Sequence, residues 1–585
     1  MNPETRTCQN CKNEFTIEPE DFNFYEKIKV PAPTFCPTCR MQRRFAWRNE
    51  RNLYRGKDRA TGKEVFTGIP PHSPLMIYEI EYWRSDAWDS LQYGRSYDFS
   101  RHFFEQLKEL IYAVPWPSRS VYNIKNSDYS DQAGHLKNCY LCFNLDYTED
   151  SVYSVKAPNC KHVIDVFEVH HSELCYDSVN ITECSRTFYS ADCDSCLDVW
   201  FSKNLVGCNN CVGCVNLRNK SYHIFNAPYS KEDYKKKLEA MNFRSRQGVE
   251  EIKKQVYDFW LQYPVKFMRG LRNLNSTGEA LRNTKNARDC YMVQDAENVK
   301  YVQMTYIGTT DSWDYSVWGN KSARMYETLV CGDECDSLRF SFDCWPACRN
   351  LEYCVACRSS ADCFGCVGLK KKQYCIFNKQ YSKEEYEALR EKIISHMNEM
   401  PYVDSKGIVY KYGEFLPTEF SPFAFNETML ADYFPLSKDE AIAKGYKWKD
   451  PELREYQITM SAEKIPDSID ETTDEILKEI LQCASCKRAF RIVRQELDFY
   501  RRIGIPLPNL CHNCRYLARF GLINRPKFYT RSCHCGGQKS QSGIYQNTAK
   551  HFHGQDPCPN EFETSYAPER PEIVYCEKCY QSEVV

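Results

Sequence analysis

The sequence predicts a multidomain α+β protein in which Cys-rich terminal modules flank two β-solenoid repeat arrays with helical caps. Three observations indicate this fold class. Paired CxxC motifs lie near both ends, the middle of the chain has a twelve-residue repeat, and a capping box follows each repeat array. With 585 residues the chain is long enough for several domains, because single hydrophobic cores rarely exceed about 250–300 residues.

The CxxC motifs occur as matched sets. At each end, one CxxC pair is followed by a second at the same interval, and aligning Cys8 with Cys483 also superimposes neighbouring aromatic and proline residues. The chain therefore contains a duplicated module. Two such pairs supply four thiolates at about 2.3 Å from a tetrahedral Zn²⁺, whereas a thioredoxin-like redox motif is a single CxxC beside a βαβ pattern. We predict two structural zinc-ribbon sites with the ligands Cys8, Cys11, Cys36, Cys39, Cys483, Cys486, Cys511 and Cys514.

A third zinc site is predicted from cysteines that only the C-terminal copy of the module contains. Cys535 is an alternative ligand or a spare thiol, and we expect His551 and His553 to lie on the surface rather than to bind metal. The expected content is about three Zn²⁺ per chain. The favoured ligands of the third site are Cys533, Cys558, Cys576 and Cys579.

The stretch 136–226 repeats at every twelfth position. One phase of the repeat is apolar or aromatic, and the phase two residues later is nearly always small. A large and a small residue two positions apart are typical of the inward face of a β-strand. Their recurrence predicts a solenoid core of stacked strands. The sequence leaves open the handedness and whether one coil takes one repeat or two. The large phase comprises Tyr140, Val152, Ile164, Tyr176, Phe188, Trp200, Val212 and Ile224.

A second array, over residues 288–378, repeats less regularly, with aromatic residues about twelve apart and occasional slips. Both arrays end alike, because YHIFN at 222–226 matches YCIFN at 374–378. Each is followed by a charged helix that starts at a capping box, at Ser230 and at Ser382. We expect these helices to cover solenoid ends that would otherwise expose unpaired strand edges.

The central cysteines need a separate interpretation. Cys208-x₂-Cys211-x₂-Cys214 resembles an iron–sulfur ligand run. However, all cysteines of the first array fall on positions three apart in the repeat, which the coil geometry explains. We interpret them as buried, reduced thiols that pack as small hydrophobes. A metal count well above three per chain would contradict this interpretation.

The repeats, motifs and composition shifts together predict the domain boundaries. Two further helices are expected at 99–112 and near 437–444. The predicted domains are an N-terminal zinc-ribbon domain with a basic stripe and an aromatic-rich extension (1–120), the first β-solenoid (121–228), a helical cap and connector (229–282), the second β-solenoid (283–380), a helical cap with a Pro- and aromatic-rich region (381–465), an acidic linker (466–480), the second zinc ribbon (481–532) and the third zinc module (533–585).

Basic residues follow the second CxxC pair of each terminal module, with aromatic residues between them. Arginine binds phosphate in a bidentate manner and aromatic rings stack on unpaired bases, so this pattern favours nucleic acid. The alternatives are a solvated helix face and intramolecular pairs with acidic residues of the arrays. The candidate nucleic-acid-binding residues are Arg40, Arg43, Arg44, Arg48, Arg51, Arg55, Arg515, Arg519, Arg525, Lys527 and Arg531.

Several function classes are not favoured. No apolar run approaches the ~18–20 residues of a membrane span, and the N-terminus lacks the apolar core of a signal peptide. We therefore expect a cytoplasmic protein, in which 33 cysteines indicate metal ligands or buried thiols. The sequence has no Gly-rich phosphate loop, nucleophile elbow or HExxH motif, and we do not expect an enzyme.

Several motifs together resemble a family of uncharacterised bacterial Cys-rich zinc-ribbon proteins with central repeats. The residues that carry the resemblance are CPTCR at 36–40, RRFAWRNE at 43–50, NCY at 138–140, YHIFN at 222–226 and PEIVYCEKCY at 571–580. The resemblance implies this architecture and no mechanism. Such proteins are sometimes labelled CoA-transferases, and nothing in the sequence supports that label.

The expected function is non-catalytic. We expect a zinc-dependent binding or scaffold protein that binds RNA or a ribonucleoprotein, such as the ribosome, through its basic ends. The alternative is a protein–protein interaction scaffold that uses the solenoid surfaces, and a metal- or thiol-dependent enzyme is a minor alternative. No small-molecule substrate and no membrane partner are evident.

Overall fold

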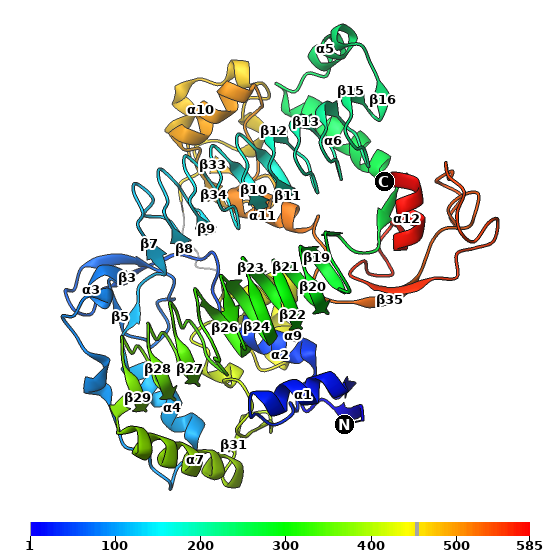
Figure 1. Cartoon of the computed structure of the whole chain (residues 1–585). Helices are drawn as coiled ribbons and strands as arrows, with labels where there is room; N and C mark the ends of the chain where they lie inside the picture. The colour runs from blue at the N-terminus through cyan, green and yellow to red at the C-terminus, as the bar shows by residue number, and fades with distance from the viewer. Residues whose placement is uncertain (1, 451–455) are drawn as a thin grey trace.

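The computed structural model describes residues 2–450 and 456–585 (Figure 1). Its central feature is a β-solenoid of short parallel strands, to which helices and Cys-rich modules from both ends of the chain are attached. The predicted β-solenoid is therefore confirmed. We call residues 121–224 the first solenoid segment and residues 270–376 the second solenoid segment.

The first solenoid segment uses one twelve-residue repeat for each coil. Its strands pair in parallel at this register, as in Ile164↔Tyr176 and Thr187↔Val199, and isolated bridges such as Tyr140↔Val152 continue the ladder. A coil of two repeats is therefore excluded for this segment. Its strands are β7 (Val121–Tyr122), β8 (Asp131–Gly134), β9 (Phe143–Asp146), β10 (Ile164–His170), β11 (Tyr176–Thr182), β12 (Ser185–Phe188), β13 (Leu197–Trp200), β14 (Asn209–Val212) and β15 (Ser221–Ile224).

The second solenoid segment mixes coil lengths, which explains the slips in its aromatic column. Trp313 pairs with Tyr326, a register of thirteen, whereas Cys363 pairs with Cys375, a register of twelve. Its strands are β18 (Gly270–Leu271), β19 (Gly278–Arg282), β20 (Lys285–Arg288), β21 (Cys290–Gln294), β22 (Ala296–Lys300), β23 (Gln303–Tyr306), β24 (Thr309–Gly319), β25 (Ser322–Ala323), β26 (Tyr326–Gly332), β27 (Arg349–Glu352), β28 (Ala361–Phe364) and β29 (Gln373–Ile376).

Every coil turns at corner residues with left-handed backbone conformation. In one coil Asn159, His162 and Asp165 have φ of 55°, 53° and 55°, so the corners lie three residues apart. Asn and Asp tolerate this conformation better than most residues. They also form ladders along the solenoid, as where Asn138 Nδ2 donates to Asp150 Oδ1 at 2.9 Å. The corners therefore account for many of the Asn and Asp residues of the solenoid, although other corners carry Tyr, Phe or Leu.

Small side chains at the inward positions bond to the backbone of two coils. Ser154 Oγ lies 3.0 Å from Val152 O and 3.3 Å from Val163 O. Cys160 Sγ makes the same contacts, at 3.4 Å to Pro158 O and 3.3 Å to Val169 O. Cys and Ser therefore replace each other in these columns because both are small donors. All the central cysteines are buried, which confirms that part of the sequence interpretation.

The column geometry predicts different effects for two substitutions of one cysteine. Cys354 is fully buried and its Sγ lies 3.4 Å from Glu352 O and 3.5 Å from Cys363 O. We expect Cys354→Ser to change stability by less than about 1 kcal/mol, because the hydroxyl keeps both contacts. Cys354→Leu overpacks the column and is expected to cost about 1–3 kcal/mol. The midpoint of urea unfolding distinguishes them, and equal midpoints would contradict this account.

Each solenoid segment ends in a hairpin and a helix. Strands β15 and β29 pair with the short antiparallel strands β16 (Ala227–Pro228) and β30 (Lys379–Gln380). Helix α5 (Lys231–Ala240) then begins at Ser230 and contacts β15, and α7 (Lys383–Glu399) begins at Ser382 and contacts β29. The predicted helix starts and their position on the last coils are confirmed. The expected helices near 99–112 and 437–444 are α4 (Phe103–Ala113) and α9 (Lys438–Ala443).

The duplicated terminal modules have the same order of elements. The N-terminal copy contains β1 (Glu4–Thr7), β2 (Glu14–Ile17), α1 (Pro19–Lys27), α2 (Pro37–Phe45), β3 (Tyr54–Lys57), β4 (Glu64–Thr67), β5 (Ile77–Tyr78) and α3 (Ile80–Arg84). The C-terminal copy contains β33 (Leu481–Gln482), β34 (Ala489–Phe490), α10 (Arg494–Ile503), α11 (His512–Phe520), β35 (Tyr529–Ser532), β36 (Glu561–Thr564), β37 (Ile573–Tyr575) and α12 (Glu577–Val584).

The terminal modules cross over, because the second helix of each packs on the solenoid segment that is farther from it in the sequence. Helix α2 contacts β24 and β26 of the second solenoid segment, and α11 contacts β10 and β11 of the first (Figure 1). The remaining elements connect these bodies. They are β6 (Trp116–Pro117), α6 (Arg246–Trp260), β17 (Pro264–Lys266), which pairs with β37, β31 (Tyr402–Val403), β32 (Val409–Tyr410) and α8 (Met429–Tyr433).

Two expected boundaries differ from the structure. Parallel pairing in the second solenoid segment begins at Gly270 rather than at 283. The segment 466–480, expected to be an acidic linker, packs against the body of the protein: Ile469 and Ile476 are buried, and Asp467 accepts a hydrogen bond from Ser245 Oγ. The acidic composition predicted an exposed linker. However, the apolar residues between the acidic ones are buried, and they hold the segment against the body of the protein.

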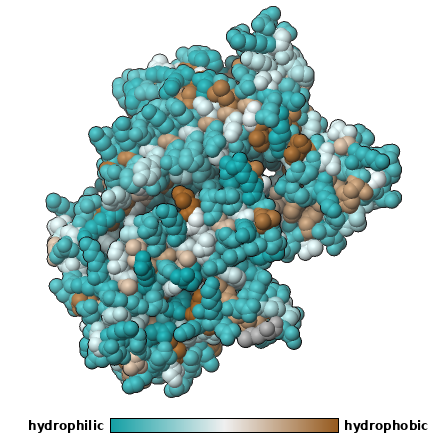
Figure 2. Space-filling view, in the orientation of Figure 1, coloured by the Kyte–Doolittle hydropathy of each residue, from teal (hydrophilic) through white to brown (hydrophobic). Residues whose placement is uncertain are grey.

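The outer surface is mainly polar on the face that Figure 2 shows, with apolar residues in small, separated groups. Within residues 2–450 and 456–585, none of the helices combines the length and apolar composition needed to cross a bilayer.

Candidate metal centres and the helix clasps

The first two predicted cysteine sets each converge on a single point. The first CxxC pair of each module follows a strand, β1 or β33, and the second begins a helix, with Cys36 and Cys511 as N-caps of α2 and α11. The four Sγ atoms in each set lie within 4.8 Å of one another. The sequence therefore correctly grouped Cys8, Cys11, Cys36 and Cys39, and also Cys483, Cys486, Cys511 and Cys514.

The sulfur separations match those of a tetrahedral metal site. Cys11 Sγ and Cys36 Sγ are 3.7 Å apart, as are Cys486 Sγ and Cys511 Sγ. Four ligands about 2.3 Å from a central ion lie about 3.8 Å apart. A disulfide would require about 2.05 Å. The groups therefore have the size of a four-sulfur metal site.

Backbone amides stabilise the thiolate form at these sites. Cys36 N donates to Cys8 Sγ and Cys511 N donates to Cys483 Sγ, each at 3.3 Å. Burial raises the pKa of Cys483, but the N–H groups of Cys511 and Cys486 favour the thiolate, and its pKa is about 6. The anionic form is the one that binds metal.

The third predicted set also converges. Cys533, Cys558, Cys576 and Cys579 are all buried, and their sulfurs lie within 4.8 Å of one another. Cys558 Sγ lies 3.8 Å from Cys576 Sγ. In the N-terminal copy Asp58 occupies the position of Cys533, and its carboxylate accepts a hydrogen bond from Glu79 N at 3.0 Å. A hydrogen-bonded carboxylate there replaces the cysteine cluster of the C-terminal copy.

A fourth group was not predicted. Cys535, His551, His553 and Cys579 place their ligand atoms within 4.8 Å of one another, so Cys579 belongs to two groups. The expectation that both histidines lie on the surface is wrong for His551, which is 3% exposed, and His553 is partly buried. The spacing of the histidine pair was the available signal. The chain fold, which brings residues 535, 551–553 and 579 together, could not be read from spacing.

Helix α2 is attached to the second solenoid segment by buried arginine–carboxylate pairs. Arg40 Nη2 lies 2.8 Å from Asp314 Oδ2, and Arg44 Nη1 lies 2.8 Å from Glu327 Oε2. Arg43 Nη2 lies 2.6 Å from Glu327 Oε1. Burial raises the pKa of Glu327, but the three guanidinium groups hold it below its usual value. Asp314 is on β24 and Glu327 on β26, so these ion pairs span adjacent coils. We call the ion pairs of the three α2 arginines with these two carboxylates the α2 clasp.

Helix α11 forms an equivalent clasp on the first solenoid segment. Arg515 and Arg519 occupy the positions of two α2 arginines when the two terminal modules are aligned. Arg515 Nε lies 2.8 Å from Asp165 Oδ2, and Arg519 lies 2.8 Å from Asp165 Oδ1 and 3.2 Å from Asp177 Oδ1. Asp165 is on β10 and Asp177 on β11, so this α11 clasp also spans adjacent coils.

The clasps correct the prediction of a nucleic-acid surface. The guanidinium groups used in the clasps are enclosed between the terminal modules and the solenoid, and Arg48 is buried beside Glu50. A phosphate cannot reach them in this structure. The intramolecular alternative therefore holds for Arg40, Arg43, Arg44, Arg48, Arg515 and Arg519.

The other five candidate basic residues are more accessible. Arg55, Arg525 and Lys527 are exposed. Arg51 and Arg531 are partly buried; Arg51 pairs with Asp432 at 3.2 Å, and Arg531 Nη1 donates to Ala567 O at 3.0 Å. Their role in nucleic-acid binding stays a prediction.

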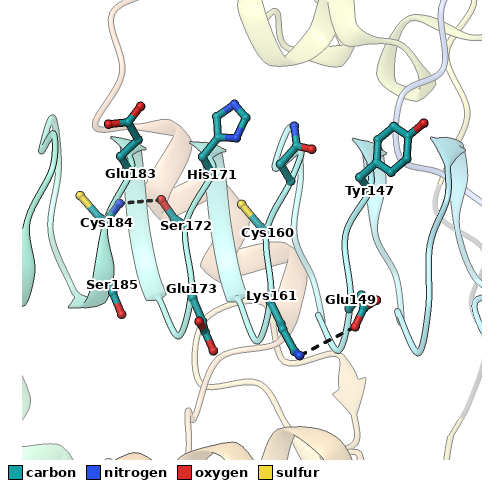
Figure 3. A pocket seen from close by; sticks show the side chains of 11 residues that line it. Tyr147, Glu149, Cys160, Lys161, His171, Ser172, Glu173, Glu183, Cys184 and Ser185 are labelled. Atoms are coloured by element: carbon teal, nitrogen blue, oxygen red, sulfur yellow. Dashed lines mark hydrogen bonds and ion pairs between the residues drawn. The ribbon is translucent and has the colours of Figure 1, made fainter.

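A shallow, open groove of about 610 Å³ runs along one side of the first solenoid segment (Figure 3). Two rows of outward-pointing side chains border it, and small residues such as Cys160, Ser172 and Cys184 lie between them. One row lies at coil corners, the other lies two residues later in each coil, and both recur at every twelfth position. One row contains Tyr147, Asn159, His171 and Glu183, and the other contains Glu149, Lys161, Glu173 and Ser185.

The fold and these sites define a Cys-rich β-solenoid repeat protein with candidate metal centres in its terminal modules. No protein-family model matches the chain, and a comparison with curated proteins also found no match. The geometry of the sites is therefore the basis for the function proposed below.

Proposed function

We propose that this chain is a non-catalytic, zinc-dependent scaffold protein that binds a protein partner through the surface of its solenoid. The observation that carries the non-catalytic, zinc-dependent part of the proposal is the pairing of Cys₄ groups with helix clasps in both terminal modules. Four thiolates complete a tetrahedral Zn²⁺ site and leave no coordination position for a substrate. Such a site stabilises a fold rather than performing a reaction, and about three Zn²⁺ occupy the Cys₄ groups.

Zinc has a defined structural task in this proposal. Cys36 and Cys39 lie in the first turn of α2, and Arg40 and Arg44 follow on the same helix. An ion held by those cysteines fixes the start of the helix. It therefore also fixes the position of the arginines that pair with carboxylates of the solenoid. The same order recurs on α11. Metal binding in the terminal modules thereby supports the arrangement of both solenoid segments.

The groove on the first solenoid segment is the proposed partner surface. Glu149, Glu173 and Glu183 outnumber Lys161, so the groove carries net negative charge. Lys161 is itself close to Glu149, with Nζ–Oε2 at 3.9 Å. Complementary charge favours a partner with an extended basic segment. The alternative, RNA bound through exposed basic residues, has Arg55, Arg525 and Lys527 as its remaining accessible candidates.

A purification experiment with two matched variants tests the proposal. The full chain is isolated under native conditions, with and without ribonuclease, and bound protein and RNA are identified by mass spectrometry and sequencing. We expect a protein partner that resists ribonuclease, is lost from the variant E149K/E173K/E183K and is retained by R525E/K527E. Co-purifying RNA that is lost only from R525E/K527E would overturn the protein-scaffold proposal in favour of RNA binding.

A further inference from the structure

We propose that Cys535, His551, His553 and Cys579 bind an additional zinc ion, so that the Cys579 thiolate bridges two metal ions in a binuclear centre. The other ion would be held by Cys533, Cys558 and Cys576 together with Cys579. This inference rests on the proposal that the Cys₄ groups hold zinc. It raises the expected content from about three to four Zn²⁺ per chain.

The ligand separations fit a tetrahedral site with two sulfur and two nitrogen ligands. His551 Nδ1 lies 3.4 Å from Cys535 Sγ, and His553 Nε2 lies 3.3 Å from Cys579 Sγ. With Zn–N near ~2.05 Å and Zn–S near ~2.3 Å, tetrahedral N and S ligands lie about 3.6 Å apart. The nitrogen atoms therefore face the sulfurs at nearly the separation that a shared ion imposes.

The second nitrogen of each histidine ring is held by an acceptor. His551 Nε2 lies 2.7 Å from Glu583 Oε1, and His553 Nδ1 lies 2.6 Å from Asp556 O. Each ring must place its N–H on that nitrogen, which leaves a lone pair on His551 Nδ1 and on His553 Nε2. Metal-bound histidines are usually fixed in this way, by a carboxylate or a backbone carbonyl on the far side of the ring.

Glu583 is itself firmly positioned. Its side chain and that of His551 have no exposed surface. Thr548 N and Ala549 N donate to its carboxylate at 2.8 and 3.1 Å, and Tyr545 OH donates at 3.0 Å. Glu583 lies one turn after Cys579 on α12, so the bridging thiolate and the carboxylate that orients His551 come from one helix.

Charge also favours two ions over one. The two groups bring five cysteines together, of which Cys535 and Cys579 belong to the fourth group. Five thiolates with one Zn²⁺ have a formal charge of −3, and with two Zn²⁺ the charge is −1. Asn547 Nδ2 also donates to Cys535 Sγ at 3.2 Å, which suits a thiolate acceptor. A second ion removes most of the repulsion among buried anions.

The additional ion has a structural consequence for the segment between the strands of this module. Residues 533–560 connect β35 to β36, whereas the equivalent connection in the N-terminal copy spans only 58–63. Cys535, His551 and His553 tie that long connection to α12. Metal binding therefore orders a loop that has few strand pairings of its own.

Metal counting on the full chain tests the inference. The intact protein is expected to contain four Zn²⁺ by elemental analysis and native mass spectrometry, and three in His553→Ala and in His551→Ala. His534→Gln is the matched control, because His534 lies between two ligands but its Nε2 faces Arg531 Nη2 at 3.0 Å, and it is expected to keep four. Three Zn²⁺ in the intact protein, or four in both alanine variants, would overturn the inference while leaving the Cys₄ proposal intact. No bound zinc at all would overturn both.

Cobalt substitution tests the bridge itself. With Co²⁺ in all four sites, a shared thiolate couples the spins of two ions, so the electron paramagnetic resonance signal is expected to integrate to the two isolated ions of the other modules. In His553→Ala the signal should rise to three uncoupled ions. A signal from four independent ions in the intact protein would show that Cys579 is not shared.

Discussion

Loss of the proposed zinc ion from either duplicated module is expected to unfold that module and detach its helix clasp. Cys511→Ser removes one of four ligands from the site at the start of α11, and Cys36→Ser does the same for α2. Structural zinc sites contribute on the order of 10–16 kcal/mol of apparent binding free energy. We expect each variant to lose one Zn²⁺ and to show an early thermal transition, measured by calorimetry, that is absent from the intact protein.

The control is the same chemical change in the solenoid. Cys211 is fully buried and its Sγ lies 3.5 Å from Asn209 O and 3.8 Å from Lys220 O, contacts that a serine hydroxyl can make. Cys211→Ser is therefore expected to keep the full zinc content and a nearly unchanged thermal transition. If Cys511→Ser kept its zinc and its stability as well, the structural role proposed for that site would be wrong.

Removing a clasp arginine is expected to have the second largest effect. Arg519 is 2% exposed and pairs with Asp165 and Asp177. Arg519→Ala leaves Asp165 with only Arg515 and Asp177 with only Lys253 as a cationic partner. Breaking a buried ion pair from one side typically costs about 3–5 kcal/mol. We expect a large fall in the urea concentration at which the protein unfolds. Arg44→Ala, at the equivalent position of the α2 clasp, is expected to behave similarly.

An exposed ion pair on the same solenoid segment provides the comparison. Arg186 pairs with Asp198, and 49% of the Arg186 side chain is exposed. Such surface pairs contribute about 0–1 kcal/mol, so Arg186→Ala is expected to leave the unfolding midpoint almost unchanged. Equal midpoint shifts for Arg519→Ala and Arg186→Ala would mean that the clasp does not hold the module in place.

Local patterns in the sequence predicted much of the fold. The CxxC spacing and the alignment of the two ends of the chain identified the first two cysteine groups and the duplicated modules, and the favoured third group was also correct. The alternation of large and small residues identified the solenoid. Ser230 and Ser382 marked the starts of two helices. These features can be recognised in the sequence because each depends on residues at a fixed, short spacing. The features are the two thiolates of a CxxC pair, the inward-facing residues of a strand, and the residues that cap the free N–H groups of a helix.

The partner of each charged side chain was decided by the tertiary structure. The arginines that follow each CxxC pair have the same spacing whether they face solvent, nucleic acid or Asp165 and Asp314. The packing of α2 and α11 on the two solenoid segments places these arginines against Asp314 and Asp165. These carboxylates lie hundreds of positions away from the arginines in the sequence. The fourth ligand group has the same origin, because only the folded chain brings His551 and His553 to Cys535 and Cys579. Sequence spacing records short-range geometry, whereas long-range pairing depends on how whole modules pack.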